Sequence, residues 1–377
     1  MGVRSGLPHS SKRALLICID GCDPDYIKRS SVPNLRRLAR EGMYIERGVS
    51  IVPTVTNVNN VSLITGVYPD IHGITSNCYY DRDSGKEVYM ESAEFIRVKT
   101  IFEKVNKLGL RTALLTSKEK LLTLLRRGAE TMLSAENPPQ WVVKEVGVQP
   151  NIYSSEVNIW LFEALLSVIQ RFELNFVYLA TTDYIMHKYS PEDSEAQEHM
   201  AAIDTGIGKL IDLFPDALFC VTADHGMAEK EKTVNLEAIL KNHGIRSIVI
   251  PTVKDKYVPH HSNLSGSAYV YLLNRQDRVR AYEILRQTEG VEEVLTNTES
   301  ARYHLPVEYT GDLFVLGEED YVFGRIDDIE RKKVDQLRSH GSLHEREVPI
   351  FCGRILERRV TENKELATVI LDYLSEP

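Results

Sequence analysis

The sequence predicts an α/β fold in which a doubly wound, mostly parallel sheet carries helices on both faces. Three continuous apolar runs, at Ala14–Ile19, Phe176–Ala180 and Ala217–Thr222, are typical of strands that are buried on both faces. Polar residues follow each run directly and a helical pattern comes next, which is the order expected of a parallel sheet. The chain has 377 residues, 43% of them hydrophobic, so it can bury a large core and still hold an insertion.

The segments between these runs support the same fold. Helical periodicity marks Ser31–Gly42, Asn57–Thr65, Ala93–Leu108, Ser154–Phe172, Ser194–Leu213 and Glu362–Leu374. Thr112–Thr116 and Val348–Cys352 have the composition of further strands. Gly66 and Gly42 each follow a predicted helix, at the position where glycine commonly ends one.

The pattern changes after about residue 228. Short strands and one helix, near Asp277–Thr288, alternate there without any carboxylate–histidine doublet. We therefore predict a core formed by residues 1–228 and 332–377 and a smaller inserted α/β cap domain at 229–331. The insertion is expected to lie over the C-terminal edge of the main sheet.

Charge and cysteine content narrow the function classes. The formal net charge of −9 argues against a general nucleic-acid binder. No stretch is long enough to cross a bilayer, and the apolar run Ala14–Ile19 is too short for a signal peptide, so no membrane partner is expected. We interpret the scattered cysteines as reduced residues of a cytoplasmic protein: Cys18, Cys22, Cys78, Cys220 and Cys352. The sequence is compatible with a homo-oligomer.

Carboxylate and imidazole groups follow the predicted strands, where α/β folds place their ligand chemistry. Asp183 and His187 are four residues apart and would share one face of a helix. The candidate metal ligands are Asp20, Thr56, Asp183, His187, Asp224, His225 and His340. Such ligands suit zinc, and also manganese or iron, and they are numerous enough to hold two ions. His260, His261 and His344 have no spacing partner and receive no role.

Thr56 stands at the start of the helix predicted for Asn57–Thr65. The N–H groups and the macrodipole at a helix N-terminus favour negative charge and would favour an alkoxide. Taken alone, Thr56 is as well explained as a helix N-cap. Because the chain also carries several pairs of candidate metal ligands, we favour the interpretation of Thr56 as a catalytic nucleophile.

These segments resemble the alkaline phosphatase superfamily, in its nucleotide pyrophosphatase/phosphodiesterase branch. The similar motifs are Asp20 in CIDG, Thr56 in TNVNN with SLITG, YPDIHGI, Asn77 in SNCYYD, Asp183 with His187, ADHGM and His340 in RSHG. The resemblance implies two zinc ions, a threonine nucleophile at Thr56 and a phosphoryl-oxygen donor at Asn77. It assigns one zinc to Asp20, Thr56, Asp224 and His225, and the other to Asp183, His187 and His340. The chain departs from the branch at Asn57-Val58-Asn59 and after His340.

Within that branch, Lys118 and Lys120 resemble the lysine pair that binds the substrate carboxylate in phosphonoacetate-hydrolysing members. An extended path after Thr112–Thr116 would point both ammonium groups the same way. The predicted activity is hydrolysis of the carbon–phosphorus bond of phosphonoacetate, a small phosphonate, through a phosphothreonine. Alternative functions are a nucleotide pyrophosphatase or phosphodiesterase, an inactive anion-binding member and a manganese-dependent mutase. The alternative for Lys118 and Lys120 is that they are surface lysines without a role.

Overall fold

The computed structural model describes residues 12–259, 261–325 and 330–376, and its centre is a seven-stranded sheet. The sheet order is β2-β16-β8-β1-β7-β5-β6. Its strands are β1 (Ala14–Cys18), β2 (Met43–Val49), β5 (Thr112–Thr116), β6 (Thr131–Ser134), β7 (Phe176–Ala180), β8 (Leu218–Thr222) and β16 (Glu347–Cys352). The run from β8 to β6 is parallel throughout, while β16 is antiparallel to β8 and β2. The predicted mostly parallel sheet is confirmed.

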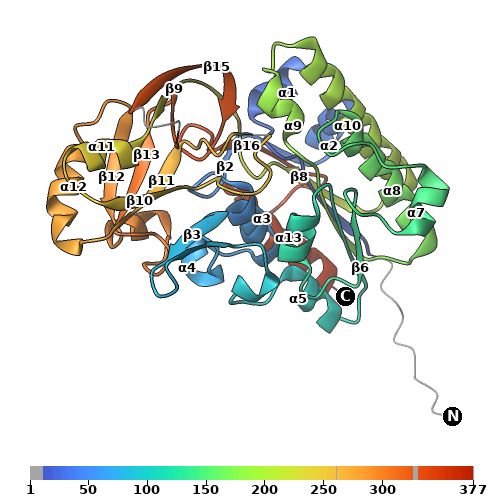
Figure 1. Ribbon diagram of the computed structural model, residues 1–377. Coiled ribbons are helices and arrows are strands. Elements are labelled where there is room, and N and C mark those ends of the chain that lie inside the picture. Colours follow the sequence, from blue (N-terminus) through green and yellow to red (C-terminus); the bar gives the residue numbers. More distant parts are fainter. Residues whose placement is uncertain (1–11, 260, 326–329, 377) are drawn as a thin grey trace.

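Helices cover both faces of this sheet (Figure 1). Alternate residues of β1 point to opposite sides: Leu15 and Ile17 join one apolar core, and Leu16 joins the other. The first core is covered by α1 (Pro24–Arg29), α2 (Pro33–Glu41), α7 (Gln140–Val146), α8 (Glu156–Arg171), α9 (Tyr184–Lys188) and α10 (Ser194–Leu213). The second is covered by α3 (Thr56–Thr65), α5 (Ile101–Lys107), α6 (Glu119–Leu125) and α13 (Leu366–Ser375), with short α4 (Pro69–His72) packed against α3.

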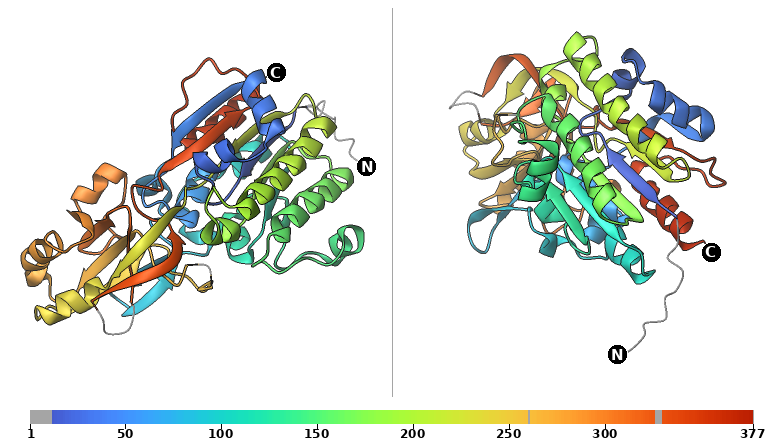
Figure 2. Two further views of the ribbon diagram at one scale, coloured as in Figure 1. Left: turned by 90° about the horizontal axis from the view of Figure 1, so that it is seen from above. Right: turned by 90° about the vertical axis from the view of Figure 1, so that its right-hand side faces the viewer.

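A second, antiparallel sheet lies beside this core (Figure 2). Its order is β10-β11-β13-β12, from β10 (Ser247–Pro251), β11 (Ser267–Leu272), β12 (Val291–Thr296) and β13 (Leu313–Gly317). Helices α11 (Leu236–Asn242) and α12 (Arg278–Leu285) pack on one face. The hairpin of β3 (Cys78–Asp81) and β4 (Lys86–Tyr89) packs on the other, although it belongs to the predicted core in sequence.

A β-ribbon joins the two sheets. Strand β9 (Ala228–Val234) leads out of the core, β15 (Arg331–Ser339) leads back, and the two pair in antiparallel fashion, with β14 (Tyr321–Phe323) beside β9. These pairings support our proposal that residues 229–331 form an inserted domain, with the ribbon as its stem.

One helix differs from the sequence prediction. The segment 93–108 forms a single 3₁₀ turn at Ala93–Phe95 and a helix that begins only at Ile101. The cause is local, because the Thr100 side chain accepts the Glu103 N–H while the Glu103 carboxylate accepts the Thr100 N–H, a capping box that starts the helix there. The five cysteines are free and buried. Within the described ranges, none of the helices has the length and apolar character needed to cross a membrane.

Candidate active site

Three buried aspartates meet where neighbouring strands end. Asp20 follows β1, Asp183 follows β7 and Asp224 follows β8, and these strands are adjacent in the order β8-β1-β7. Each aspartate is at most 3% exposed. Because the carboxyl ends of parallel strands share one edge, the fold itself brings the three carboxylates together.

Gly21 permits this close approach. Its φ of +73° belongs to the left-handed region, and a Cβ there would lie 3.0 Å from the Cβ of Asp183. The Gly21 N–H donates to Asp224 Oδ1 at 3.3 Å. A residue with a side chain at this position would therefore push the Asp20 and Asp183 segments apart.

Three buried histidines turn the same ring nitrogen toward these carboxylates. The Nδ1 atoms of His187, His225 and His340 lie 2.7, 2.8 and 2.7 Å from the backbone carbonyls of Arg338, Gly226 and Thr54. A carbonyl only accepts, so each Nδ1 carries a proton and each ring presents Nε2 to the carboxylates. This is the arrangement of a histidine that binds metal through Nε2.

The Nε2 atoms lie close to the aspartates. His187 Nε2 is 2.9 Å from Asp183 Oδ2, His225 Nε2 is 3.4 Å from Asp20 Oδ1, and His340 Nε2 is 3.9 Å from Asp183 Oδ2. The ring of His340 stacks on that of His225 with a centroid distance of 3.7 Å. Two groups result in which candidate ligand atoms all lie within 4.8 Å of one another: Asp183, His225 and His340, and Asp20, Asp224 and His225.

The charges of this cluster favour a bound cation. Burial, reinforced by the charges of Asp183 and Asp224, raises the pKa of Asp20 well above its usual value. Burial likewise raises the pKa of Asp224 to about 6, and it lowers the pKa of His340 well below the usual range. Within the described residues, Asp20 Oδ1 is buried without a hydrogen-bond partner. The donor set fits divalent metal ions, which would supply that partner and neutralise the carboxylates.

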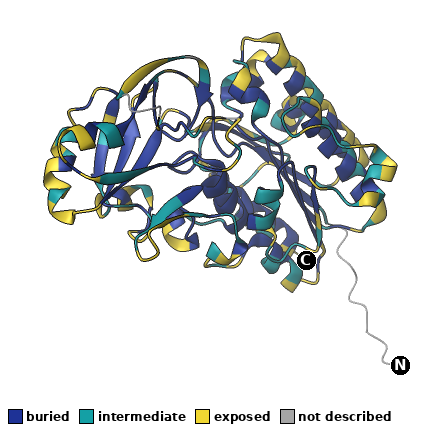
Figure 3. Cartoon of the chain, viewed as in Figure 1, coloured by how far each residue is buried: buried dark blue, intermediate teal, exposed yellow. Residues whose placement is uncertain are grey.

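Thr56 is the first residue of α3, a helix whose residues are all buried (Figure 3). Its Oγ1 atom lies 3.3 Å from His225 Nε2. The N-cap position belongs to Val55, so the interpretation of Thr56 as a helix cap is wrong. The hydroxyl oxygen instead lies among the candidate metal ligands.

Two asparagines that the sequence analysis missed support these groups. Asn60 donates to Asp224 Oδ2 at 2.9 Å and to the Thr56 carbonyl at 3.0 Å. Asn158 on α8 binds the backbone N–H and carbonyl of Thr182, both at 2.9 Å. The available signal was position: Asn60 is one helical turn after Thr56, and Asn158 interrupts an apolar helix face.

Asn77 holds the insertion against the core. Its Nδ2 donates to the Val253 carbonyl at 3.0 Å and its backbone N–H donates to the Thr252 carbonyl, also at 3.0 Å. One Nδ2 proton remains for another acceptor, since an amide nitrogen carries two.

Lys118 is buried and the Lys120 side chain is 7% exposed, but the backbone of the pair differs from the expectation. Lys118 is extended, whereas α6 begins at Glu119 and places Lys120 in its first turn, so the predicted extended path across both residues is wrong. Lys118 Nζ donates to Asp183 Oδ1 at 3.2 Å, and Lys120 Nζ pairs with Asp255 of the insertion. Both ammonium groups lie against the same ring, with Lys118 Nζ 5.9 Å and Lys120 Nζ 5.2 Å from the centroid of Tyr257.

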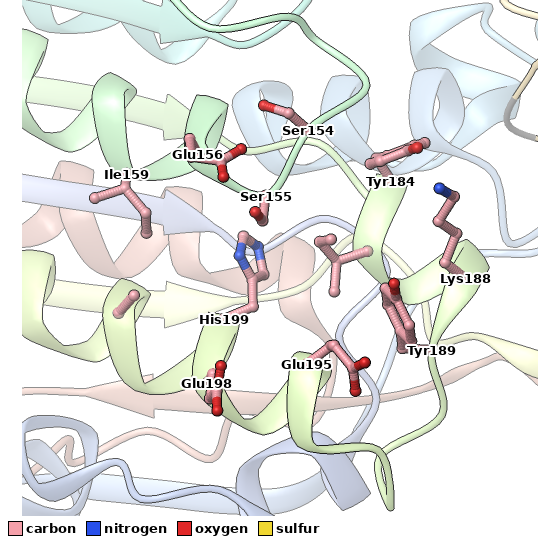
Figure 4. Close-up of a pocket in the computed structure, with 12 residues that line it drawn as sticks. Ser154, Ser155, Glu156, Ile159, Tyr184, Lys188, Tyr189, Glu195, Glu198 and His199 are labelled. Atoms are coloured by element: carbon pink, nitrogen blue, oxygen red, sulfur yellow. The ribbon is translucent and has the colours of Figure 1, made fainter.

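The other histidines differ in their surroundings. His261 is buried, and its Nε2 lies 3.2 Å from Asp255 Oδ1. His344 is exposed and pairs with Glu292 at 2.7 Å. His260 lies outside the described residues. A separate pocket of about 450 Å³ lies beside α9. Figure 4 shows His199 and Tyr184 among its lining side chains, and none of the candidate metal ligands lines it.

The fold and this cluster define a protein with a candidate metal centre at the carboxyl edge of a mostly parallel sheet. Residues 14–343 match the family model described as Type I phosphodiesterase / nucleotide pyrophosphatase, and the chain belongs to that family. It therefore lies in the nucleotide pyrophosphatase/phosphodiesterase branch of the alkaline phosphatase superfamily, as the sequence motifs predict.

Solved structures and curated proteins show similar relatives. The chain resembles phosphonoacetate hydrolase from Sinorhizobium meliloti 1021, solved with phosphonoformate and with phosphonoacetate, at a TM-score of 0.87 and 30% identity, covering 96% of each chain. Murine ectonucleotide pyrophosphatase/phosphodiesterase 5 shares the fold at a TM-score of 0.71 and 17% identity, covering 97% of this chain and 95% of that one. Bis(5'-adenosyl)-triphosphatase ENPP4 of Bos taurus is 25% identical over 242 residues, which are 61% of this chain. The chain spans about half the length of this curated relative, 51%.

Proposed function

We propose that the chain hydrolyses the carbon–phosphorus bond of phosphonoacetate to acetate and phosphate. The observation that carries this proposal is the placement of two lysines close to the metal cluster: buried Lys118 donates to Asp183, and Lys120, with a side chain 7% exposed, lies with it against the ring of Tyr257. A phosphomonoester or diester carries no carboxylate for them to bind. The similarity to phosphonoacetate hydrolase supports the same substrate.

Two zinc ions are the proposed cofactors, held by Asp20, Thr56, Asp224 and His225 and by Asp183, His187 and His340. Bound zinc lowers the pKa of a hydroxyl group and polarises phosphoryl oxygens. The same ligands would accept manganese or iron.

Thr56 is the proposed nucleophile. The hydroxyl gives up its proton to solvent and Oγ1 forms a bond to phosphorus, while the bond from phosphorus to the methylene carbon breaks and the departing carbon takes the electron pair. Asn77 donates one Nδ2–H to a phosphoryl oxygen, and this hydrogen bond stabilises the negative charge on that oxygen in the transition state. The product is a phosphothreonine at Thr56, and attack of water on its phosphorus releases phosphate and restores the hydroxyl.

The lysines act on the leaving group. A carbanion next to a carboxylate is delocalised as an enediolate, so negative charge grows on the carboxylate oxygens during bond breaking. Ammonium groups at those oxygens stabilise the transition state more than the ground state, and protonation of the carbon then gives acetate. Burial lowers the pKa of the Lys118 ammonium group, but the charges of Asp183, Asp20 and Asp255 outweigh it and raise that pKa.

A second candidate function is hydrolysis of a phosphodiester or pyrophosphate. The family model and the curated relatives favour it, and it uses the same Thr56 and metal ligands. It gives Lys118 and Lys120 no substrate group to bind.

The deciding experiment measures phosphate release from phosphonoacetate by a malachite-green assay, with chelator and with added zinc. Hydrolysis of bis(4-nitrophenyl) phosphate is measured on the same preparation. We expect zinc-dependent phosphate release from phosphonoacetate. Turnover of the diester with no release from phosphonoacetate would overturn the proposal in favour of the second function.

A further inference from the structure

One segment of the insertion reaches across to the lysine pair. Asp255 forms an ion pair with Lys120, in which both side chains are under 10% exposed. Tyr257, two residues later, lies against both lysines: its ring centroid is 5.9 Å from Lys118 Nζ and 5.2 Å from Lys120 Nζ. These distances are within the range of a cation–π interaction.

Asp255 is itself firmly held. Its Oδ1 accepts the Tyr257 N–H at 2.6 Å and lies 3.2 Å from His261 Nε2. His261 Nδ1 accepts the Asn263 N–H at 3.0 Å, so the ring proton is on Nε2 and is donated to Asp255. Both nitrogens of His261 are therefore engaged, and this histidine positions Asp255 and does not bind metal.

The far end of Tyr257 is anchored on the core. Its hydroxyl donates to Glu136 Oε2 at 3.0 Å, and the same carboxylate oxygen accepts the Glu119 N–H at the start of α6 at 2.8 Å. The ring is thus fixed at its backbone by the insertion and at its hydroxyl by Glu136, which also binds the start of the helix that carries Lys120. It lies within cation–π distance of both ammonium groups.

We propose that Tyr257 is a specificity-determining residue that closes the carboxylate end of the site and selects short carboxylated phosphonates. This inference rests on the proposed function, because it takes Lys118 and Lys120 as the carboxylate-binding pair. In this proposal a carboxylate approaches the lysines from the side of Asp183, to which Lys118 donates. A substrate with more methylene groups between phosphorus and carboxylate presses its carboxylate against the ring.

The test measures binding by calorimetry on the zinc-loaded full chain, with two probes of different length that lack the reactive acetate group. Phosphonoformate is the short probe and 3-phosphonopropionate is the long one. We expect the wild type to prefer the short probe. In Tyr257→Ala we expect that preference to fall about tenfold. Without the ring the lysines are held less firmly, which weakens binding of the short probe, and the long probe gains space.

Two variants serve as matched controls. Tyr257→Phe keeps the ring and loses only the hydroxyl bond to Glu136, so it should keep the preference within about twofold. Lys256→Ala removes a neighbouring exposed residue that pairs with Glu91 and should change nothing. An unchanged preference in Tyr257→Ala, or an equal loss in Tyr257→Phe, overturns the inference. Phosphate release from phosphonoacetate by the wild type is measured separately, so a failure of the proposed function is distinguishable from a failure of this one.

Discussion

The core and the insertion contribute to the candidate site in different ways. The core supplies Asp20, Asp183 and Asp224 from the ends of adjacent parallel strands, each fixed by a strand buried on both faces. The insertion supplies Asp255 and Tyr257 from a segment between β10 and β11 whose described residues form no helix or strand. The order of the strands in the sheet fixes the positions of side chains at the strand ends, while the side chains of a connecting segment are positioned by individual contacts.

This difference suggests a division of labour between the two regions. The candidate metal ligands and the proposed nucleophile all come from outside residues 229–331, and Asp255 and Tyr257 within them contact the proposed carboxylate-binding lysines. If so, changes in the core should affect every phosphoryl substrate. Changes at the two lysines, or at the insertion residues that contact them, should affect only a substrate with a carboxylate.

The largest effect is expected at Thr56. Thr56→Val removes the hydroxyl from a buried position with little change of volume, so the fold and the metal content should persist. Loss of a nucleophile is expected to lower kcat by at least about a thousandfold on both phosphonoacetate and a diester. Thr56→Ser retains the hydroxyl and should keep partial activity. Steady-state kinetics with metal analysis provide the check, and full activity in Thr56→Val would eliminate the covalent mechanism.

The next effect is expected at His340, a candidate ligand from the returning segment of the core. His340→Ala should reduce bound zinc from two equivalents toward one and lower activity by at least about a hundredfold on both substrates. His344→Ala is the control, because His344 pairs with exposed Glu292 away from this cluster. Elemental analysis after dialysis measures the zinc content. Two full equivalents in His340→Ala would contradict the assigned ligand set.

A smaller and more selective effect is expected at Lys120. Lys120→Ala should lower activity on phosphonoacetate about ten- to a hundredfold, with a lower kcat and a higher KM, because a charge-assisted bond that strengthens in the transition state is lost. Diester turnover should be nearly unchanged. Lys254→Ala, which removes a lysine that pairs with Glu87, serves as the control. Equal losses on both substrates would show that Lys120 has a general role.

Lys118 sharpens the comparison between the two regions, because it contacts Asp183 of the metal cluster as well as Tyr257 of the insertion. Lys118→Ala should therefore lower phosphonoacetate turnover as Lys120→Ala does, and should also weaken zinc binding. A zinc titration of the two variants separates these effects. Identical zinc affinities in both would contradict the role of the Lys118–Asp183 contact.

The site residues of the core could be predicted from the sequence more easily than those of the insertion. Strands such as Phe176–Ala180 are visible as unbroken apolar runs, and the residues that follow them must meet at one sheet edge. The path of Lys120 was missed because Glu119 begins a helix whose start has no strong cap signal in the sequence. Asp255 and Tyr257 carry no periodicity, and their pairing with residues more than a hundred positions away depends on how the insertion packs.

The smallest effect is expected at Asn158, which belongs to the core but touches none of the proposed substrate groups. Its amide accepts from Thr182 N–H and Ser117 Oγ, and donates to the Thr182 carbonyl and to His199 Nε2, so all four bonds are inside the protein. Ser117 precedes Lys118 and Thr182 precedes Asp183. Asn158 therefore fixes the distance between a proposed substrate-binding residue and a candidate metal ligand.

Asn158→Ala should lower the free energy of unfolding by about 1–3 kcal/mol, because buried backbone groups lose their partners. It should lower kcat a few-fold on phosphonoacetate and less on a diester, since the relative position of Lys118 matters only for the carboxylate. Denaturant unfolding and kinetics on both substrates measure the two effects. Asn242→Ala, at an exposed asparagine that donates to Glu330 in the insertion, should leave both unchanged. If Asn158→Ala affects the two substrates equally, then Asn158 stabilises the fold without setting the position of Lys118.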